Sequence, residues 1–235
     1  MCGRYVLRTP VEELRRVFDC IERPNLMPRY NIAPTQDVPV IRQRRKPPGE
    51  RTLQMLRWGL VPGFAEDPKM GARLINARAE TVAEKASFRT AFLKRRCLVP
   101  ADGFYEWRAD GTRKQPYLIQ RRDRGVFAFA GLWDRWTPQE KREGEGPDFI
   151  DSFTIITTEA NSLLRPLHER MPVILDADQY APWLDPDGAP KRLLTMLKPA
   201  PEEWLSYGPV GVEVNAARAE GAGLVELTGI EVIAA

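Results

Sequence analysis

The residue with the most distinctive chemistry in this sequence is a cysteine at position 2, directly after the initiator methionine. Methionine aminopeptidases act when the second residue is small, so we expect Met1 to be lost and Cys2 to become the mature N-terminus. Cys2 then carries an α-amine and a thiol. An α-amine has a reference pKa of about 7.8, so about 14% of it is neutral at pH 7, against about 0.04% of a lysine.

This pair of groups is suited to capturing an aldehyde. A neutral amine forms a Schiff base with an aldehyde, and the neighbouring thiol can close onto the imine carbon to give a five-membered thiazolidine. Judged by position alone, Cys2 is better explained as the ordinary second residue of an exposed or buried terminus. The functional interpretation therefore depends on the rest of the chain.

Five short segments follow a known pattern. They are MCGRY at 1–5, RYNIAPT at 29–35, LINARAET at 74–81, ADGFYEW at 101–107 and PLHERMP at 166–172. Together they resemble the SOS response-associated peptidase (SRAP) family, and the resemblance runs in order from Cys2 to about Glu226. It implies a single SRAP domain over residues 1–235 that crosslinks covalently to abasic sites in single-stranded DNA. It also implies release of the chain's own Met1, the self-processing behind the peptidase label.

The matching positions imply that Cys2 is the nucleophile and that Asn76, Glu106 and His168 are catalytic. An abasic deoxyribose is mostly a closed hemiacetal, so His168 can carry a proton to or from a sugar oxygen as the ring opens. Glu106 can accept a proton from the α-ammonium, especially if burial raises its pKa. Asn76 can fix the amine or an oxygen. Alone, His168 is better explained as a core histidine and Glu106 as a strand-edge carboxylate paired with an arginine; five segments in register favour catalysis.

Three arginines stand beside the predicted catalytic residues and are expected to bind DNA phosphates. They are Arg4, Arg78 and Arg170, and a guanidinium binds phosphate bidentately while remaining charged. Solvent-exposed surface charge is their simpler explanation.

The segment 29–35, with Asn31, Pro34 and Thr35, is also expected to contact DNA and to lend backbone amides to a phosphate, although Pro34 has no N–H. After WGLVPG at 58–63, members of the family often carry two tryptophans. This chain has Phe64 and Ala65 there. Phe64 can stack on a base and Ala65 cannot, so DNA affinity and junction preference are expected to differ.

Composition excludes several classes of protein. No run approaches the roughly 18 apolar residues of a membrane span, and no secretory signal follows Met1, so we expect a cytoplasmic, nucleoid-associated location without membrane contact. The three cysteines are too few for a disulfide framework, and Cys20 and Cys97 are expected in the core. With one histidine and no C-x-x-C pair, no metal is expected, and the chemistry requires no cofactor.

Charge is distributed unevenly. Residues 1–100 hold 20 Lys and Arg against 10 Asp and Glu, whereas the remainder holds 15 against 22. A fold that gathers the first hundred residues on one face would present a surface suited to a polyanion. Solvated surface charge explains the same counts.

The elements that must position these residues suggest an α+β fold. A helix is expected with Thr9 as its N-cap, Glu12 completing a capping box, and an apolar face that includes Leu14 and Phe18. A second helix is expected with Ser87 as its cap and with Phe88, Ala91 and Phe92 along it, and short helices are expected near 177–184, 190–197 and 201–206. Strands are expected at 54–61, 97–101, 116–120, 126–132, 152–157, 172–175 and 230–233. Residues 21–50 are expected to be irregular, and 137–148 to form a surface loop. The pattern predicts a mostly antiparallel, barrel-like sheet with peripheral helices, the SRAP fold.

Two other functions remain open. One is an N-terminal-nucleophile amidohydrolase, in which the Cys2 thiol attacks an amide. The other is a non-covalent single-stranded DNA-binding module, which leaves Cys2, Glu106 and His168 without a task. The expected partner is single-stranded DNA containing abasic sites. The chain is expected to be monomeric, and association with the replication machinery is left open.

Overall fold

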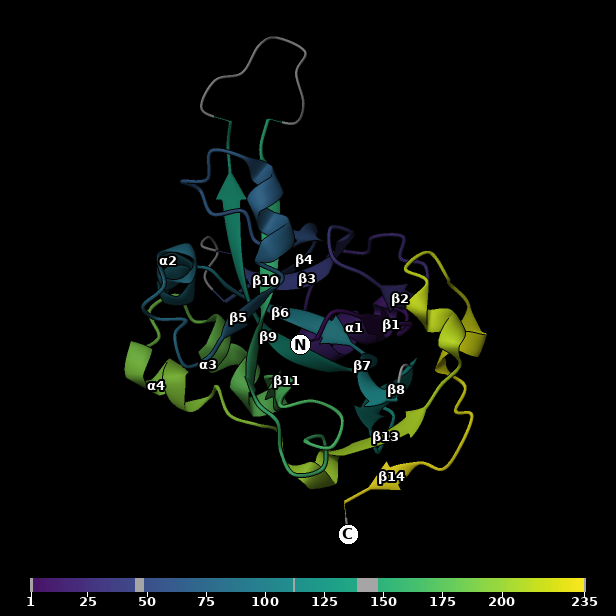
Figure 1. Ribbon diagram of the computed structural model, residues 1–235. Helices are drawn as coiled ribbons and strands as arrows, with labels where there is room; N and C mark the ends of the chain where they lie inside the picture. Colours follow the sequence, from purple (N-terminus) through teal and green to yellow (C-terminus); the bar gives the residue numbers. More distant parts are fainter. Residues whose placement is uncertain (1, 45–48, 112, 139–147, 235) are drawn as a thin grey trace.

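The centre of the molecule is a closed barrel of five strands (Figure 1), in a computed structural model that describes residues 2–44, 49–111, 113–138 and 148–234. Around the ring they are β10 (Ile150–Glu159), β4 (Arg51–Trp58), β3 (Asp37–Gln43), β6 (Arg96–Ala101) and β9 (Phe127–Trp136). β9 pairs with β10 to close the ring. Only the β10–β4 pair of this ring is parallel. The predicted barrel-like, mostly antiparallel fold is confirmed.

Three short strands extend the barrel wall near the middle of the molecule. β5 (Asn76–Arg78) runs parallel to β10, and β11 (Arg170–Pro172) and β12 (Ile174–Leu175) pair antiparallel with β10 and β9. Ile155 faces Asn76 and Thr157 faces Arg78 in the β10–β5 register, while Glu159 faces Arg170. One barrel strand therefore holds two separate segments of the predicted site.

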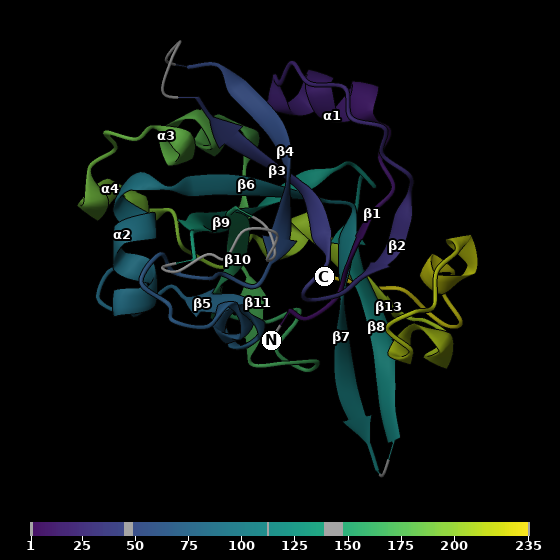
Figure 2. The same cartoon turned by 90° about the horizontal axis from the view of Figure 1, so that it is seen from above.

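A second sheet packs beside the barrel. Its order is β14 (Val232–Ile233), β13 (Leu205–Pro209), β8 (Arg113–Arg121), β7 (Gly103–Asp110), β1 (Tyr5–Leu7) and β2 (Arg29–Ile32). β1 pairs with β7 only through Tyr5 and Val6, so β7 continues past the start of β1. The β7–β8 hairpin projects from the body (Figure 2).

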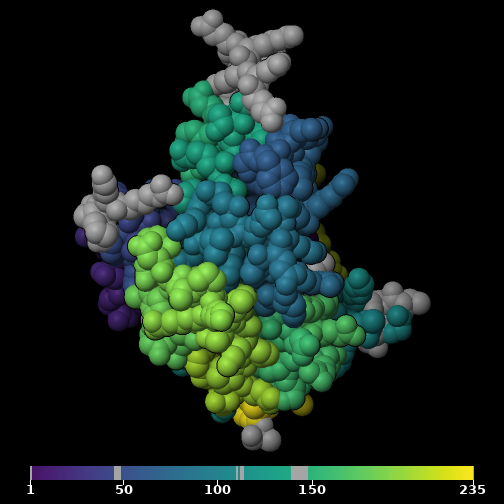
Figure 3. Space-filling view, turned by 90° about the vertical axis from the view of Figure 1, so that its left-hand side faces the viewer, coloured from purple at the N-terminus to yellow at the C-terminus, as the bar shows by residue number. Residues whose placement is uncertain are grey.

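Helices cover one side of the barrel, as the space-filling view shows for the blue and yellow-green segments of α2, α3 and α4 (Figure 3). The α-helices are α1 (Val11–Phe18), α2 (Ala86–Lys94), α3 (Tyr180–Leu184) and α4 (Pro190–Thr195). Short 3-10 turns are η1 (Pro68–Arg73), η2 (Ala177–Gln179), η3 (Glu202–Trp204), η4 (Val212–Asn215) and η5 (Ala222–Val225). None of the helices in these described ranges has both the length and the apolar character to cross a bilayer.

Both predicted helix caps are wrong, although both helices form. The Thr9 hydroxyl donates to Asp102 Oδ1 at 2.5 Å, and α1 begins after Pro10 without a side-chain cap. Asp102 also accepts from the Arg8 and Thr9 backbone amides, so this tertiary partner replaces the capping box. Ser87 lies inside α2, whose N-cap is Lys85.

Two further expectations need correction. Residues 21–50 were expected to be irregular, yet they contain β2 and β3, whose apolar positions pack into the barrel despite the surrounding prolines and arginines. The expected helix at 201–206 is only the turn η3, because Leu205 is buried as the first residue of β13. Most of the expected loop at 137–148 lies outside the described residues.

Candidate active site

Cys2 lies at the start of the chain, just before β1, and is fully buried in the chain that still carries Met1. Asn76 Nδ2 donates a hydrogen bond of 2.8 Å to the Cys2 carbonyl oxygen. Burial raises the pKa of the Cys2 thiol, and the nearby Glu106 carboxylate raises it further. The thiol is therefore neutral at pH 7 in this form of the chain, and the same interaction shows that Glu106 lies close to it.

Glu106 approaches from β7, because the Tyr105 amide donates to the Arg4 carbonyl at 3.0 Å and draws the strand alongside the N-terminal residues. Its side chain is buried, and burial raises its pKa. A carboxyl group with a raised pKa holds its proton closer to neutral pH, which suits proton transfer.

His168 lies in the loop between β10 and β11 and is fixed by two hydrogen bonds. Its backbone amide donates to the Leu164 carbonyl at 3.1 Å, and its Nδ1 accepts from the Arg170 amide at 2.9 Å. Since Nδ1 is the acceptor, the neutral ring carries its proton on Nε2. Burial lowers the pKa of His168, so this neutral tautomer predominates at pH 7.

Two cavities meet at His168. The first, which we name the tryptophan cavity, has a volume of about 450 Å³ and is lined by Arg4, Glu106, Trp107, Lys114, His168 and Asn215. The second, the arginine cavity, has a volume of about 710 Å³ and is lined by Arg78, Glu159, Arg165, His168, Glu169 and Arg170. The four predicted catalytic residues thus come together, with Cys2 and Asn76 hydrogen-bonded beside the two that line the cavity walls.

The three predicted DNA-binding arginines differ in how they are held. Arg170 donates to both Glu80 carboxylate oxygens, at 2.7 and 3.0 Å, and to the Thr157 carbonyl at 2.6 Å. The bond from Arg170 lowers the pKa of Glu80. Arg78 is exposed and has no hydrogen bond or ion pair with the side chains that the structure describes. Arg4 donates through Nη1 to Asn31 Oδ1 at 2.9 Å and to the Val214 carbonyl at 3.0 Å.

Asn31 was predicted to contact DNA, but its side chain instead binds the C-terminal segment of the chain. It is fully buried, and its Nδ2 donates to the carbonyls of Val214, Ala216 and Ala219 at 3.0 to 3.3 Å. Together with Arg4 it anchors the C-terminal segment around η4 against the N-terminal strands. A side chain with these contacts has no surface left for DNA.

Pro34 and Thr35 form a turn whose backbone amides are already satisfied. The Thr35 amide donates to the Trp58 carbonyl at 2.8 Å, and the Gln36 amide donates to the Ala33 carbonyl at 3.4 Å. Thr35 has a φ of 72°, as the third residue of a type II turn requires. These amides are therefore not available for the predicted phosphate contact, and the exposed Thr35 side chain remains.

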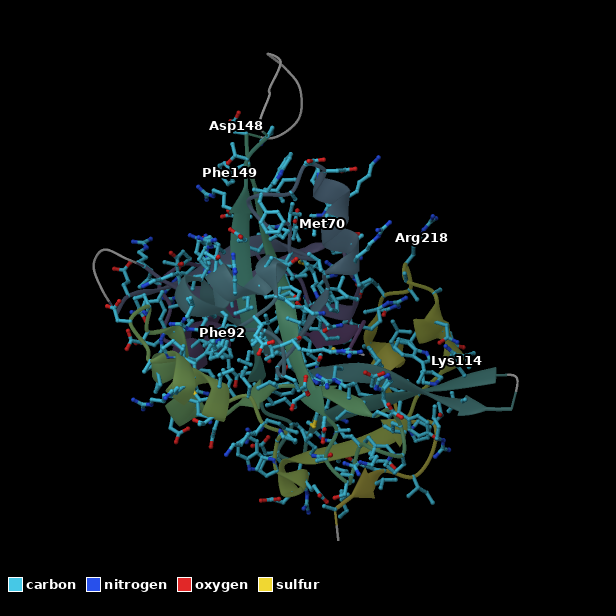
Figure 4. The ribbon with its side chains drawn as sticks, turned by 60° about the vertical axis from the view of Figure 1, so that its left-hand side comes forward. Met70, Phe92, Lys114, Asp148, Phe149 and Arg218 are labelled. Carbon is cyan, nitrogen blue, oxygen red and sulfur yellow. The ribbon has the colours of Figure 1, made fainter. Side chains whose placement is uncertain are left out.

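Phe64 and Ala65 face opposite ways. Phe64 is 56% exposed beside a cavity of about 390 Å³ that Met70 also lines. Ala65 is buried, and its carbonyl accepts from Trp136 Nε1 at 2.6 Å. Figure 4 shows Met70 toward the same end of the molecule as Phe149, another exposed aromatic residue. The exposure of Phe64 leaves its ring open to a ligand, and its stacking on a base stays a prediction.

Sequence reasoning missed three residues of the tryptophan cavity: the role of Trp107, and Lys114 and Asn215 altogether. Trp107 directly follows Glu106 in the segment 101–107 that resembles the family, so its position in the sequence could have suggested that it lies near the site. Nothing local marks Lys114 on the hairpin or Asn215 in η4. In the described part of the chain, no three His, Cys, Asp or Glu side chains gather to hold a metal ion.

Comparisons with known proteins identify the family. Residues 1–217 match the family described as SOS response associated peptidase (SRAP). The chain is 36% identical to the abasic site processing protein YoaM of Bacillus subtilis, over 96% of this chain and 98% of that protein. It is 31% identical to the abasic site processing protein HMCES of Xenopus tropicalis, over 93% of this chain and 76% of that protein.

Solved structures share the fold. A crystal structure of a protein from Bacteroides thetaiotaomicron superposes with a TM-score of 0.81 at 28% identity, covering 90% of this chain and 93% of that chain. A second, from Bordetella bronchiseptica, gives a TM-score of 0.72 at 30% identity, covering 90% and 100%. The chain belongs to the SOS response associated peptidase (SRAP) family.

Proposed function

We propose that this protein processes abasic sites in DNA by forming a covalent thiazolidine between Cys2 and the opened deoxyribose in a single strand. The relatives named abasic site processing proteins support the coarse function. The observation that carries the chemistry is the position of Cys2, bonded through its carbonyl to Asn76 and close to a buried Glu106 on the wall of a cavity that His168 shares.

The reaction first requires that the Cys2 nitrogen become a terminal amine. Hydrolysis of the Met1–Cys2 peptide bond consumes one water and releases methionine. The chain's own groups can support this self-processing, because the Asn76 amide holds the Cys2 carbonyl and Glu106 can exchange a proton nearby. Loss of Met1 also gives Cys2 the aminothiol that the capture chemistry needs.

Capture then proceeds by two additions. The C1′–O4′ bond of the hemiacetal breaks as the C1′ hydroxyl proton passes through water to the ring oxygen. His168 Nε2–H can donate a hydrogen bond to that oxygen while charge develops on it, because the neutral tautomer carries its proton on Nε2. The amine adds to the C1′ aldehyde, and the carbinolamine loses water to give an imine as protons pass through Glu106. The Sγ–H then adds across the C=N bond, so sulfur joins carbon and the proton goes to nitrogen. One water leaves overall, and the ring shields the sugar from β-elimination.

Phosphate contacts would come from the arginine cavity, where Arg78 is exposed without an ion pair among the described side chains. Guanidinium groups on the wall that carries His168 can hold the backbone beside the abasic sugar. Phe64, exposed at another cavity, can stack on a base of the same strand.

A denaturing gel with intact-mass analysis tests this function. Wild-type protein and single-stranded DNA with one abasic site should give a stable adduct whose mass equals protein without Met1 plus DNA minus one water. Cys2→Ala keeps an α-amine but no thiol, so it should give at most a borohydride-reducible imine. A tag that retains Met1 should abolish the adduct, and Cys20→Ala, which removes a buried cysteine on another element, should not.

The same gel separates the other functions. A non-covalent binding module would shift DNA on a native gel and release it on the denaturing one. An amidohydrolase would ignore the lesion. Either result with protein that has lost Met1 would overturn the proposal.

A further inference from the structure

Part of the tryptophan cavity lies beyond the groups that the proposed chemistry uses. Trp107, Lys114 and Asn215 line it together with Glu106 and His168. A volume of about 450 Å³ falls within the range of small-ligand sites, roughly 300 to 1,000 Å³. Because this cavity adjoins the proposed reaction centre, its occupant would lie directly beside the abasic sugar.

The Trp107 ring is fixed from behind. Its Nε1–H donates to Asn215 Oδ1 at 2.6 Å, and its ring centroid lies 6.4 Å from that of Tyr105. It packs on a small core cluster that includes Val214 and Leu118, yet it stays partly exposed. An aromatic ring held in place before a ligand arrives can stack on a planar group with little ordering cost.

Lys114 lies on the same face of the hairpin as Trp107. Trp107 pairs with Pro116 and Ala109 pairs with Lys114, and residues directly opposite or two apart on a strand share a face. Figure 4 shows Lys114 on the projecting β7–β8 hairpin. Lys114 is exposed and makes no ion pair with any side chain that the structure describes.

Asn215 is oriented by its bond to Trp107. Since Oδ1 accepts from the indole, the Nδ2 protons remain, and they have no acceptor among the described residues. The polar groups that Lys114 and Asn215 can offer a ligand are therefore all donors. Phosphate oxygens and the acceptor edges of bases match such donors.

We propose that Trp107, Lys114 and Asn215 form a subsite for the nucleotide next to the abasic sugar. The base stacks on Trp107, and the donors of Lys114 and Asn215 bind its phosphate or an acceptor on the base edge. This inference rests on the proposed function, and it adds a contribution of the neighbouring nucleotide to reaction at the lesion.

Oligonucleotides with one missing group test the subsite. Each carries one abasic site and either a tetrahydrofuran spacer at one neighbour, which removes the base, or a methylphosphonate at one flanking linkage, which removes the charge. Both sides are tested separately. On one side, the spacer should slow wild-type adduct formation at subsaturating protein by about 5- to 100-fold, the range of a lost base stack.

Variants then assign the loss to side chains. Trp107→Ala should be slow with intact DNA and should show no further loss with the spacer. Lys114→Met should be slow with intact DNA and should show no further loss with the methylphosphonate. Lys191 is an exposed lysine on α4, and Lys191→Met should behave like wild type. Trp107→Phe keeps a ring without the N–H, and Asn215→Ala removes its acceptor. The rates of adduct formation of both variants should lie between those of wild type and Trp107→Ala. If circular dichroism shows that Trp107→Ala is unfolded, these two variants decide the test.

The results distinguish the two proposals. Adduct formation that is equally fast with spacer, methylphosphonate and intact DNA would overturn the subsite and leave the proposed function standing. The subsite would also be overturned if the spacer slowed adduct formation as much in Trp107→Phe and Asn215→Ala as it does in wild type. No adduct with any oligonucleotide would instead overturn the proposed function itself.

Discussion

The two cavities that meet at His168 are built from different kinds of side chain. The arginine cavity mixes three guanidinium groups with Glu159 and Glu169, and its members come from β5, β10, β11 and the loop between β10 and β11. The tryptophan cavity offers one aromatic ring, one amide and two cations, from β7, β8, η4 and the N-terminal residues. The arginine cavity suits charge–charge contacts, which salt screens. The tryptophan cavity suits stacking and hydrogen bonding, which depend on the shape of the ligand.

His168 belongs to both cavities and therefore faces whatever occupies either of them. Its Nδ1 is bonded to the backbone amide of Arg170, a residue of the arginine cavity. The position of the proton on Nε2 thus depends on Arg170, the first residue of β11, which is also a proposed phosphate ligand. A strand held by the arginines would reach the proposed reaction centre at the His168 ring.

The largest effect on the rate of adduct formation is expected at His168, which both cavities share. His168→Ala should slow adduct formation by roughly 10²- to 10³-fold, because losing one donor to charge that develops on an oxygen costs about this much. Single-turnover rates at saturating protein measure it, and DNA affinity should change little. Arg165→Ala, which alters the arginine cavity alone, is the control and should change affinity more than rate. Unchanged kinetics in His168→Ala would remove the imidazole from the mechanism.

Glu106→Gln tests the tryptophan side by pH dependence. Burial raises the pKa of Glu106, so the carboxylate that accepts a proton from the α-ammonium forms only above the usual range for glutamate. The wild-type rate should rise with pH through that pKa. Burial lowers the pKa of His168, so its neutral form persists below pH 6.5 and adds no loss above that value.

In Glu106→Gln the rate should fall by roughly 10²-fold, and only the rise that follows deprotonation of the Cys2 α-amine, with a reference pKa of about 7.8, should remain. Rates from pH 4.5 to 8.5 measure both. Stability should change with pH in the opposite direction to the rate. A buried carboxyl with a raised pKa lowers the free energy of unfolding as pH rises through that pKa. The variant should therefore lose less stability than wild type over this range. A pH profile with the same shape in Glu106→Gln and wild type would assign the whole rise to the α-amine and remove Glu106 from proton transfer.

The sequence could predict which residues come together at the proposed reaction centre because they stand in short local motifs. Cys2, Asn76, Glu106 and His168 each sit in a recognisable segment, and the barrel brings those segments together. The segments could not tell which side chains point inward. Asn31 shares a motif with Thr35, yet on β2 it faces the C-terminal segment and is buried.

The rest of the site depends on the path of the chain in space. Asn215 reaches the tryptophan cavity because Arg4 and Asn31 hold η4 against residues more than 180 positions earlier. No spacing within 210–220 marks such a contact. The caps failed for the same reason: Thr9 has a cap-forming side chain, but the buried Asp102 competes for its hydroxyl.

Arg170→Ala should affect stability as well as DNA binding. Arg170 is largely buried and Glu80 is about half exposed, so solvent screens the ion pair, but the bond to the Thr157 carbonyl is lost too. We expect a loss of about 1–2 kcal/mol. For a chain of this size, that lowers the melting temperature by roughly 2–8 °C. Thermal unfolding measures it, with Glu80→Gln as the partner variant. Equal stability of Arg170→Ala and wild type would show that these bonds contribute nothing.

Arg78→Ala should give the smallest effect and the cleanest comparison with Arg170. Arg78 is exposed without an ion pair among the described side chains, so its loss should leave the melting temperature unchanged. If it binds one phosphate, the variant should bind abasic-site DNA more weakly, and the slope of log K against log salt should fall by about 1. Trp107→Phe, in the other cavity, should weaken binding without changing that slope. Equal salt slopes for Arg78→Ala and wild type would mean that its charge does not contact DNA, and phosphate binding would then depend on other arginines, such as Arg165 and Arg170 of the same cavity.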